Sequence, residues 1–183
     1  DFSSKGYDVV PTLVNAADYG VPQKRERVII VGFRNEEDYN KFEFPEPLPE
    51  GNRKVLADVI IPEDNENESL FFSDRAVAGM MAVRDKMNKG RVQKLEEPCN
   101  TISSHLAKVS LNSTDPVYMV GDRYRRFSYQ EAARIQSFPD DFNFTELSQG
   151  RKYKAIGNAV PPVMMWYIAK ALQDSILASN TIV

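Results

Sequence analysis

A long apolar segment near the C-terminal end limits how this chain can fold. Residues 163–178, VMMWYIAKALQDSILA, follow two adjacent prolines, which a helix tolerates in its first turn. The segment predicts a helix with apolar side chains around most of its circumference, and such a helix must pack against a large surface. Lys170, Gln173 and Asp174 interrupt it, so it lacks the roughly 18 consecutive apolar residues of a membrane-spanning helix.

Two buried strands are predicted near the start of the chain. Residues 9–14 are β-branched and apolar apart from Pro11 and Thr12, and residues 27–33 contain the run VIIVGF. The loop between them, NAADYGVPQKRER, turns at a glycine and a proline and crowds basic residues against the second strand.

A change in composition separates these strands from the middle of the chain. The run FEFPEPLPEGN holds three prolines and one glycine among carboxylates, which is typical of an extended connector, so we expect a domain boundary at residues 45–52. VLADVI, which follows, fits a short helix or a strand, and PEDNENES is expected to be a solvated loop.

The second half of the chain alternates helical and β patterns. Residues 73–87 predict a helix, and residues 101–111 and 116–120 are β-rich. Ser128 and Glu131 predict the capping box of a short helix that the proline of FPDDF ends.

Composition excludes several classes of protein. The chain has 183 residues with one Cys and one His, too few for an intramolecular disulfide or a four-ligand zinc site. A net charge of −3 argues against wholesale coating of nucleic acid, so any nucleic-acid site must be local. The opening DFSSKGYD is not a signal peptide, and we expect a piece of a longer, cytoplasmic protein.

Three segments stand in a fixed order: NAADYGVPQKRERVIIVGFR, RRFSYQEAARIQSFPDDF and YKAIGNAVPPVMMWYIAKAL. Together they closely resemble blocks VIII, IX and X of the DNA (cytosine-5) methyltransferases. The resemblance implies part of an α/β, Rossmann-like S-adenosylmethionine-dependent methyltransferase domain with an inserted small mixed α+β target recognition domain. It assigns residues 1–44 to strands of the catalytic domain, 45–122 to the recognition domain, and 123–183 to blocks IX and X with the returning final helix.

The earlier blocks of that family are missing. Its glycine-rich adenosylmethionine-binding block, its Pro-Cys-Gln nucleophile loop and its Glu-Asn-Val block precede block VIII, and nothing before Asn15 supplies them. The resemblance therefore implies an N-terminal half, in a separate subunit or in the same polypeptide, and a chain that is inactive alone. An exposed apolar surface is expected where that half packs.

Cys99 is a false lead for the nucleophile. Pro98 and Cys99 reproduce the Pro-Cys dipeptide of the catalytic loop, but Asn100 and Thr101 follow, and the position lies between blocks VIII and IX. EPCNTISSH instead resembles the Pro-x-x-Thr-Ile segment of recognition domains in the family. We expect a partly buried thiol.

Block VIII holds the predicted catalytic residues. Methylation at carbon 5 requires a thiolate to add at carbon 6 of a flipped cytosine, so negative charge spreads over the ring. Gln23, Arg25 and Arg27 alternate and would project from one face of an extended backbone. The resemblance implies that Arg27 bonds the 2-oxo group, Arg25 orients the catalytic loop and a phosphate, and Gln23 bonds within the site. The residues alone fit a solvated basic strand edge equally well.

Block X supplies the predicted cofactor contacts. Its glycine and asparagine are expected to open the last helix, where unpaired amides can face an anion or a cofactor. The resemblance implies that the adenosylmethionine pocket is lined by Gly157, Asn158, Ala159 and Val160. The alternative is an ordinary capped core helix.

The candidate DNA contacts lie mostly in the recognition domain. A basic run at residues 84–94 can follow a phosphate backbone, and two serines after it can donate to base edges in the major groove. Block IX adds its leading arginine as a phosphate contact, next to an expected Arg134–Glu131 pair. The full set is Arg84, Lys86, Lys89, Arg91, Lys94, Ser103, Ser104 and Arg125.

The predicted activity is methyl transfer from S-adenosylmethionine to carbon 5 of cytosine in duplex DNA, as in a bacterial restriction-modification or orphan enzyme. Two alternatives stay open, a non-enzymatic DNA-recognition subunit and a relative of the RNA cytosine methyltransferases. The long insert between the first two blocks favours DNA. No metal and no membrane enter this prediction.

Overall fold

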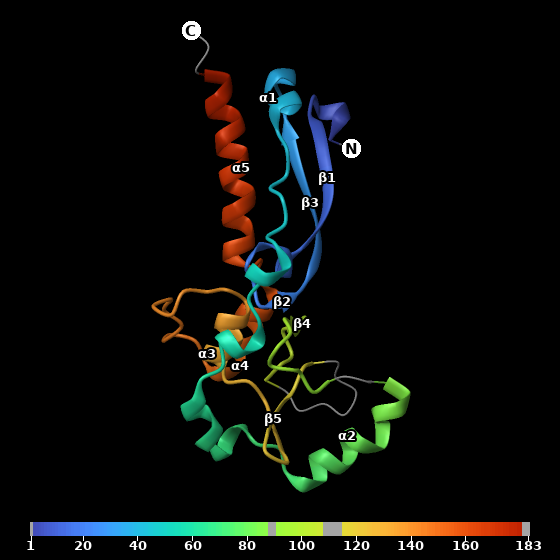
Figure 1. The fold of residues 1–183 in the computed structure, drawn as a ribbon, viewed down its shortest axis with the longest axis vertical. Coiled ribbons are helices and arrows are strands. Elements are labelled where there is room, and N and C mark those ends of the chain that lie inside the picture. The colour runs from blue at the N-terminus through green and yellow to red at the C-terminus, as the bar shows by residue number, and fades with distance from the viewer. Residues whose placement is uncertain (1, 88–90, 108–114, 181–183) are drawn as a thin grey trace.

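The computed structural model describes residues 2–87, 91–107 and 115–180. Its upper part in Figure 1 consists of a long hairpin and a long helix, and its lower part of short helices and strands joined by irregular segments. Among the described residues, no helix combines the length and apolar character needed to cross a membrane.

The hairpin consists of β1 (Asp8–Asn15) and β3 (Glu26–Phe33), which pair antiparallel from Asp8 opposite Phe33 to Asn15 opposite Glu26. Both predicted strands are therefore confirmed. Between them lie η2 (Ala16–Tyr19), whose first turn is capped by the Asn15 side chain, and β2 (Gln23–Lys24). Helix α1 (Glu36–Lys41) follows β3.

Helix α5 (Pro162–Asn180) runs alongside the hairpin (Figure 1). It starts at Pro162, one of the two prolines that the sequence allowed in its first turn. Its buried side packs on the strand–turn junction in a cluster formed by Val14, Ala16, Tyr19, Val21, Met164 and Ile168. Its other side leaves Trp166 59% exposed and Leu177 54% exposed, so the hairpin covers only part of this apolar helix.

The outer face of the hairpin is apolar and exposed. Leu13 lies opposite Val28 and Pro11 opposite Ile30, so these side chains are neighbours on one face. Leu13 is 63%, Val28 62% and Ile30 49% exposed. The expected exposed apolar surface is therefore present.

The lower part has a core of its own. It contains α2 (Asp74–Met87), β4 (Cys99–Asn100), β5 (Tyr118–Val120), β6 (Arg123–Arg125), α3 (Tyr129–Ile135) and α4 (Gln149–Asn158). It also contains short 3-10 helices at Glu50–Asn52, Leu56–Asp58, Pro62–Glu66 and Glu68–Leu70. Another short 3-10 helix, Ser3–Lys5, precedes β1 in the upper part. The buried cluster of the lower part combines residues from before and after position 122, the predicted end of the recognition domain. The cluster includes Leu56, Ile102, Phe127, Ile135 and Ile156.

Several local predictions need correction. Of the two predicted β-rich segments, only the second contains a strand, Tyr118–Val120, and the described residues of the first form no strand, with a turn at residues 104–107. The backbone N–H groups of Ile102 and Ser103 donate to the side chains of Gln23 and Asp115 in place of a strand partner. Residues 108–111 lie outside the described part. Helix α4 was not predicted, since its sequence QGRKYKAIGN has few apolar residues. The predicted helix at residues 73–87 is confirmed by α2.

Candidate functional site

A chain of buried amides joins block VIII to blocks IX and X. The Gln23 side chain accepts a hydrogen bond from the backbone N–H of Ile102 at 3.0 Å and donates to the side chain of Gln136. Gln136 in turn donates to the backbone carbonyls of Ile156, at 3.0 Å, and Ala159, at 2.6 Å. Both glutamines are fully buried, so their bonds hold distant segments in one arrangement.

The charged guanidinium group of Arg25 joins the same segments. Its guanidinium donates to the carbonyls of Ile102 at 3.2 Å, Gly157 at 3.0 Å and Ala159 at 3.3 Å, while its Nε has no partner among the described residues. Burial lowers the pKa of this group, and the nearby charge of Arg27 lowers it further. Arg25 therefore binds protein carbonyls and positions its neighbours.

Arg27 alone of the block VIII triplet faces solvent. Its guanidinium donates to the carbonyl of Glu26 at 2.6 Å. The prediction that Gln23, Arg25 and Arg27 share one face of an extended strand is wrong in this respect, because the chain changes direction between β2 and β3. There the backbone N–H of Arg25 donates to the Asn15 side chain. Only Arg27 is available to a substrate.

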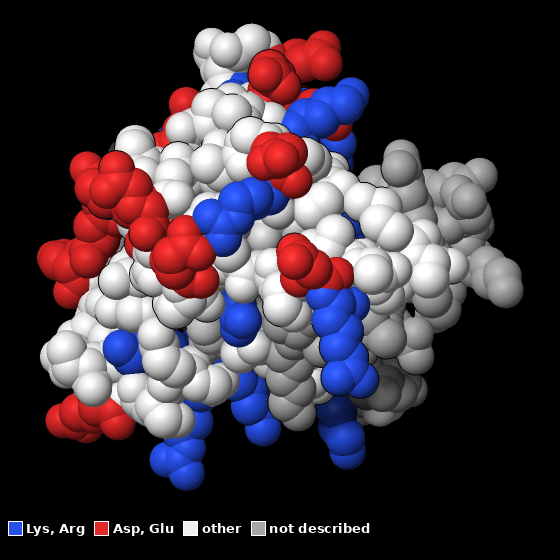
Figure 2. Space-filling view, turned by 90° about the horizontal axis from the view of Figure 1, so that it is seen from below, with Lys and Arg blue, Asp and Glu red and all other residues white. Residues whose placement is uncertain are grey.

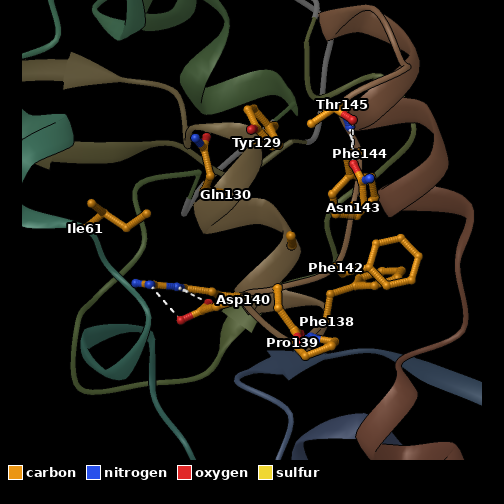
Figure 3. Close-up of a pocket in the computed structure, with 13 residues that line it drawn as sticks. Ile61, Tyr129, Gln130, Phe138, Pro139, Asp140, Phe142, Asn143, Phe144 and Thr145 are labelled. Carbon is orange, nitrogen blue, oxygen red and sulfur yellow. Dashed lines mark hydrogen bonds and ion pairs between the residues drawn. The ribbon is translucent and has the colours of Figure 1, made fainter.

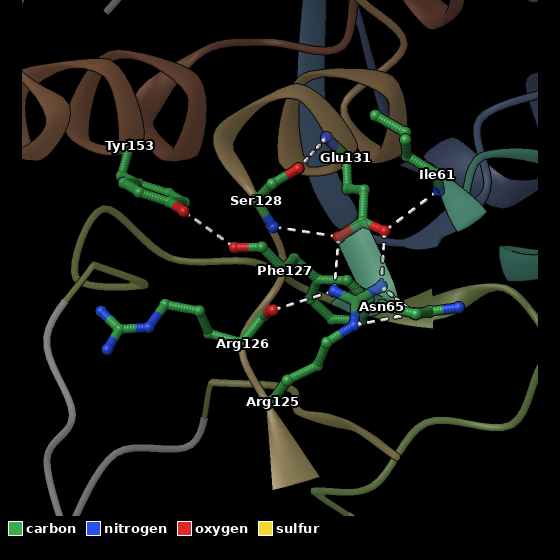
Figure 4. A network of polar contacts seen from close by, with 8 residues as sticks. All are labelled: Ile61, Asn65, Arg125, Arg126, Phe127, Ser128, Glu131 and Tyr153. Atoms are coloured by element: carbon green, nitrogen blue, oxygen red, sulfur yellow. Dashed lines mark hydrogen bonds and ion pairs between the residues drawn. The ribbon is translucent and has the colours of Figure 1, made fainter. Parts of the chain in front are cut away.

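Arg125 is buried, which corrects its assignment as a phosphate contact. Both it and Glu131 are 0% exposed, and they form a bidentate pair with two bonds of 2.7 Å (Figure 4). Glu131 also accepts from the backbone N–H groups of Ser128 and Ile61. The predicted capping box is thus confirmed, and Arg125 has no surface to offer DNA.

The expected pair between Arg134 and Glu131 is also wrong. Arg134 instead binds Asp140 at 2.7 Å, because Glu131 is taken up by Arg125. The Arg134–Asp140 pair lies at the mouth of a cavity of about 440 Å³ between α3 and the aromatic loop of Phe138, Phe142 and Phe144 (Figure 3). None of the predicted site residues lines this cavity.

Gly157 and Asn158 end α4 rather than open α5, which corrects the prediction for block X. The backbone groups that they present are consequently carbonyls, not unpaired amides. Arg25 takes up the carbonyls of Gly157 and Ala159. Asn158 and Val160 remain exposed, and among the four predicted cofactor contacts they are the accessible side chains.

Gly157 also carries a packing contact that its sequence context did not reveal. A Cβ added there would lie 2.3 Å from the carbonyl oxygen of Ser103 and 2.5 Å from the backbone nitrogen of Ser104. Only glycine permits this approach of two backbones. The turn at residues 103–105 therefore rests directly on the end of α4.

The remaining DNA candidates have different surroundings. Ser103 accepts from the N–H of His105 at 3.0 Å, and Ser104 lies 3.5 Å from the His105 ring. Arg91 donates to the carbonyl of Asp115, and burial lowers its pKa; Lys94 binds Glu97 at 2.9 Å. Arg84 and Lys86 belong to α2, but the structure does not describe their side chains. Lys89 lies outside the described residues.

Cys99 is fully buried on β4, next to β2, and burial raises the pKa of its thiol strongly. A thiolate is the nucleophilic form, so this environment suppresses reactivity. Within the described residues, no three His, Cys, Asp or Glu side chains gather as a metal site would need.

We expect Cys99→Ala to leave the activity of the protein that contains this chain unchanged. The substitution removes a buried thiol whose pKa is raised by burial, at a modest cost in stability from the small cavity. The activity of that protein, measured beside the unaltered form, checks this. An abolished kcat in a folded Cys99→Ala variant would contradict the assignment.

The profile of the C-5 cytosine-specific DNA methylases matches residues 1–174. The chain belongs to this family. The predicted resemblance is therefore confirmed, and the blocks that the buried network joins are those of a cytosine-specific DNA methylase.

Two type II methyltransferases illustrate the relationship. M.FnuDI of Fusobacterium nucleatum is 34% identical over 200 residues, which cover 96% of this chain and 58% of that protein. M.MthTI of Methanothermobacter thermautotrophicus is 36% identical over 205 residues, which cover 96% of this chain and 59% of that protein. The chain thus spans well under two thirds of the length of these relatives.

Solved structures confirm the α/β methyltransferase fold class. The Dnmt2 methyltransferase of S. pombe superposes with a TM-score of 0.72 at 13% identity, covering 96% of this chain and 60% of that chain. The methyltransferase EhMeth of Entamoeba histolytica gives a TM-score of 0.69 at 14% identity, covering 95% of this chain and 56% of that chain.

Proposed function

We propose that this chain is the C-terminal portion of a DNA (cytosine-5) methyltransferase, which transfers a methyl group from S-adenosylmethionine to carbon 5 of a flipped cytosine in duplex DNA. One observation carries the proposal. Arg25 holds the recognition segment and block X together by bonds to Ile102, Gly157 and Ala159, and this leaves Arg27 exposed beside them.

The residues of block VIII then divide into one substrate contact and two positioning groups. Arg27 meets the negative charge that develops on the ring and its 2-oxo group, a role suited to a guanidinium because it stays charged and donates in fixed directions. Arg25 and Gln23 act through the backbone segments that they bind. Residues 45–122 serve as the target recognition domain inserted before block IX.

The cofactor contacts of this chain are few. S-adenosylmethionine supplies the methyl group as an electrophile when it is bound. Asn158 and Val160 fit such a ligand, because one offers an exposed amide and the other an apolar side chain, 50% exposed, directly after the end of α4. The main binding motif and the nucleophilic cysteine belong to the N-terminal half.

That half is the proposed partner of the exposed hairpin face. Leu13, Val28 and Ile30 form an apolar surface of the kind that proteins cover, and the relatives extend well beyond the part that this chain matches. We propose that the assembled enzyme works in the cytoplasm on DNA.

Transfer of labelled methyl groups to duplex DNA tests the proposal, with this chain alone and then mixed with its N-terminal half. We expect activity only in the mixture. Arg27→Ala should lower kcat by about 10²–10³-fold, as the loss of one charge-stabilising donor does in other enzymes. Arg34→Ala, which removes an exposed arginine just beyond the other end of β3, is the matched control and should leave kcat unchanged.

Other outcomes would overturn the proposal in identifiable ways. Activity of the chain alone would show that the nucleophile is within it. Methylation of RNA in place of DNA would favour the RNA methyltransferase alternative, and sequence-specific DNA binding without methyl transfer by the mixture would favour a recognition subunit.

A further inference from the structure

Helix α4 presents two exposed cations that the proposed function does not use. Arg151 and Lys154 are three residues apart, so they lie on the same side of the helix. Neither side chain has a hydrogen bond or an ion pair to any residue in the described part of the chain. Lys152, between them, lies on a different side, 4.0 Å above the ring of Tyr129.

These cations border the segment that the site already uses. Lys154 lies one helical turn before Gly157, the residue on which the backbone of Ser103 and Ser104 rests. The bonds of Arg25 to the carbonyls of Gly157 and Ala159 bring the start of β3, with Arg27, to the same end of α4. The backbone beside Arg27, the 103–105 turn and the end of α4 that follows Lys154 are therefore close in space.

The charge on this end of the molecule is segregated. Figure 2 shows most Asp and Glu side chains over the upper and left parts of the view, where a few Lys and Arg side chains lie among them, and most Lys and Arg side chains over the lower part. Several other cations are already bound within the chain: Arg123 binds Glu68, Lys94 binds Glu97, and Arg91 donates to the carbonyl of Asp115. The exposed side chains of Arg151 and Lys154 make no such bond within the described residues, so they can bind an external anion.

The dimensions fit a nucleic-acid strand. Three residues of an α-helix rise about 4.5 Å, and phosphates of one DNA strand are about 3.4 Å apart along the duplex axis, so two long side chains can reach neighbouring phosphates. We propose that Arg151 and Lys154 form a phosphate-binding face that holds one strand of the duplex beside the target cytosine. This inference rests on the proposed methylation of DNA.

The test is the salt dependence of DNA binding by the complete enzyme, this chain with its N-terminal half. Dissociation constants for duplex DNA are measured over a series of salt concentrations for the unaltered enzyme and for the double variant Arg151→Gln, Lys154→Gln. Loss of two phosphate contacts should lower the magnitude of the slope of log Kd against log salt by about 1.8, at roughly 0.9 per phosphate. KM for DNA should rise, and kcat at saturating DNA should be unchanged.

A second double variant, Arg34→Gln with Lys170→Gln, removes the same charge from exposed positions after β3 and on α5 and should leave the slope unaltered. Equal slopes in the two double variants would overturn the inference while methyl transfer by the enzyme still supported the proposed function. Absence of methyl transfer in the unaltered enzyme would reject the proposed function. The salt dependence of DNA binding would still test whether Arg151 and Lys154 bind phosphates. A lower kcat at unchanged slope would mean that α4 acts on the catalytic site, not on phosphates.

Discussion

Replacing Glu131 by glutamine should lower the free energy of unfolding by about 3–5 kcal/mol, because it leaves the Arg125 guanidinium buried without a counter-charge. Both side chains are completely buried, and the carboxylate accepts four hydrogen bonds, two from Arg125 and one each from the backbone N–H groups of Ser128 and Ile61. A glutamine has a single acceptor oxygen and turns an NH₂ group toward these donors. Urea denaturation of the unaltered protein and of the Glu131→Gln variant measures the difference in the free energy of unfolding.

The chain contains its own control for this prediction. Arg123 and Glu68 form the same bidentate arrangement, with bonds of 2.8 and 2.7 Å, but on the surface. Glu68→Gln should therefore destabilise the protein much less than Glu131→Gln, since exposed pairs contribute little to stability. Similar losses in the two variants would show that burial of the Arg125–Glu131 pair does not govern its contribution.

Replacing Gly157 by alanine should destabilise the protein by about 1–3 kcal/mol, the usual cost of overpacking a closed contact. The new Cβ would lie 2.3 Å from the carbonyl oxygen of Ser103, so backbone must move. Movement of the Ser103–Ser104 turn should also raise KM for DNA. Thermal melting and methyl-transfer kinetics check the two effects.

Gly150, in the first turn of the same helix, is the matched control. A Cβ there meets nothing within 4 Å, so Gly150→Ala should stabilise the protein by up to about 1 kcal/mol through helix propensity alone. A neutral or stabilising Gly157→Ala variant would contradict the close approach of α4 and the 103–105 turn.

Local signals in the sequence were sufficient for the elements that depend on neighbouring residues. The β-branched runs predicted β1 and β3, Ser128 and Glu131 predicted the capping box, and the two prolines predicted the start of α5. Helix α4 escaped prediction because its stability comes from burying Tyr153 and Ile156 against other segments, not from an apolar repeat.

The three blocks are legible in the sequence, and they indicate the family, the order of the segments and the chemistry of the side chains. Which of those side chains reach solvent depends on the folded chain. Arg25 and Arg125 are buried on carbonyls and a carboxylate, while Arg27, Arg151 and Lys154 are exposed. The physical reason is that burial of an arginine depends on acceptors such as the carbonyl of Gly157, which lies 132 positions from Arg25 in the chain and approaches it only when the chain folds.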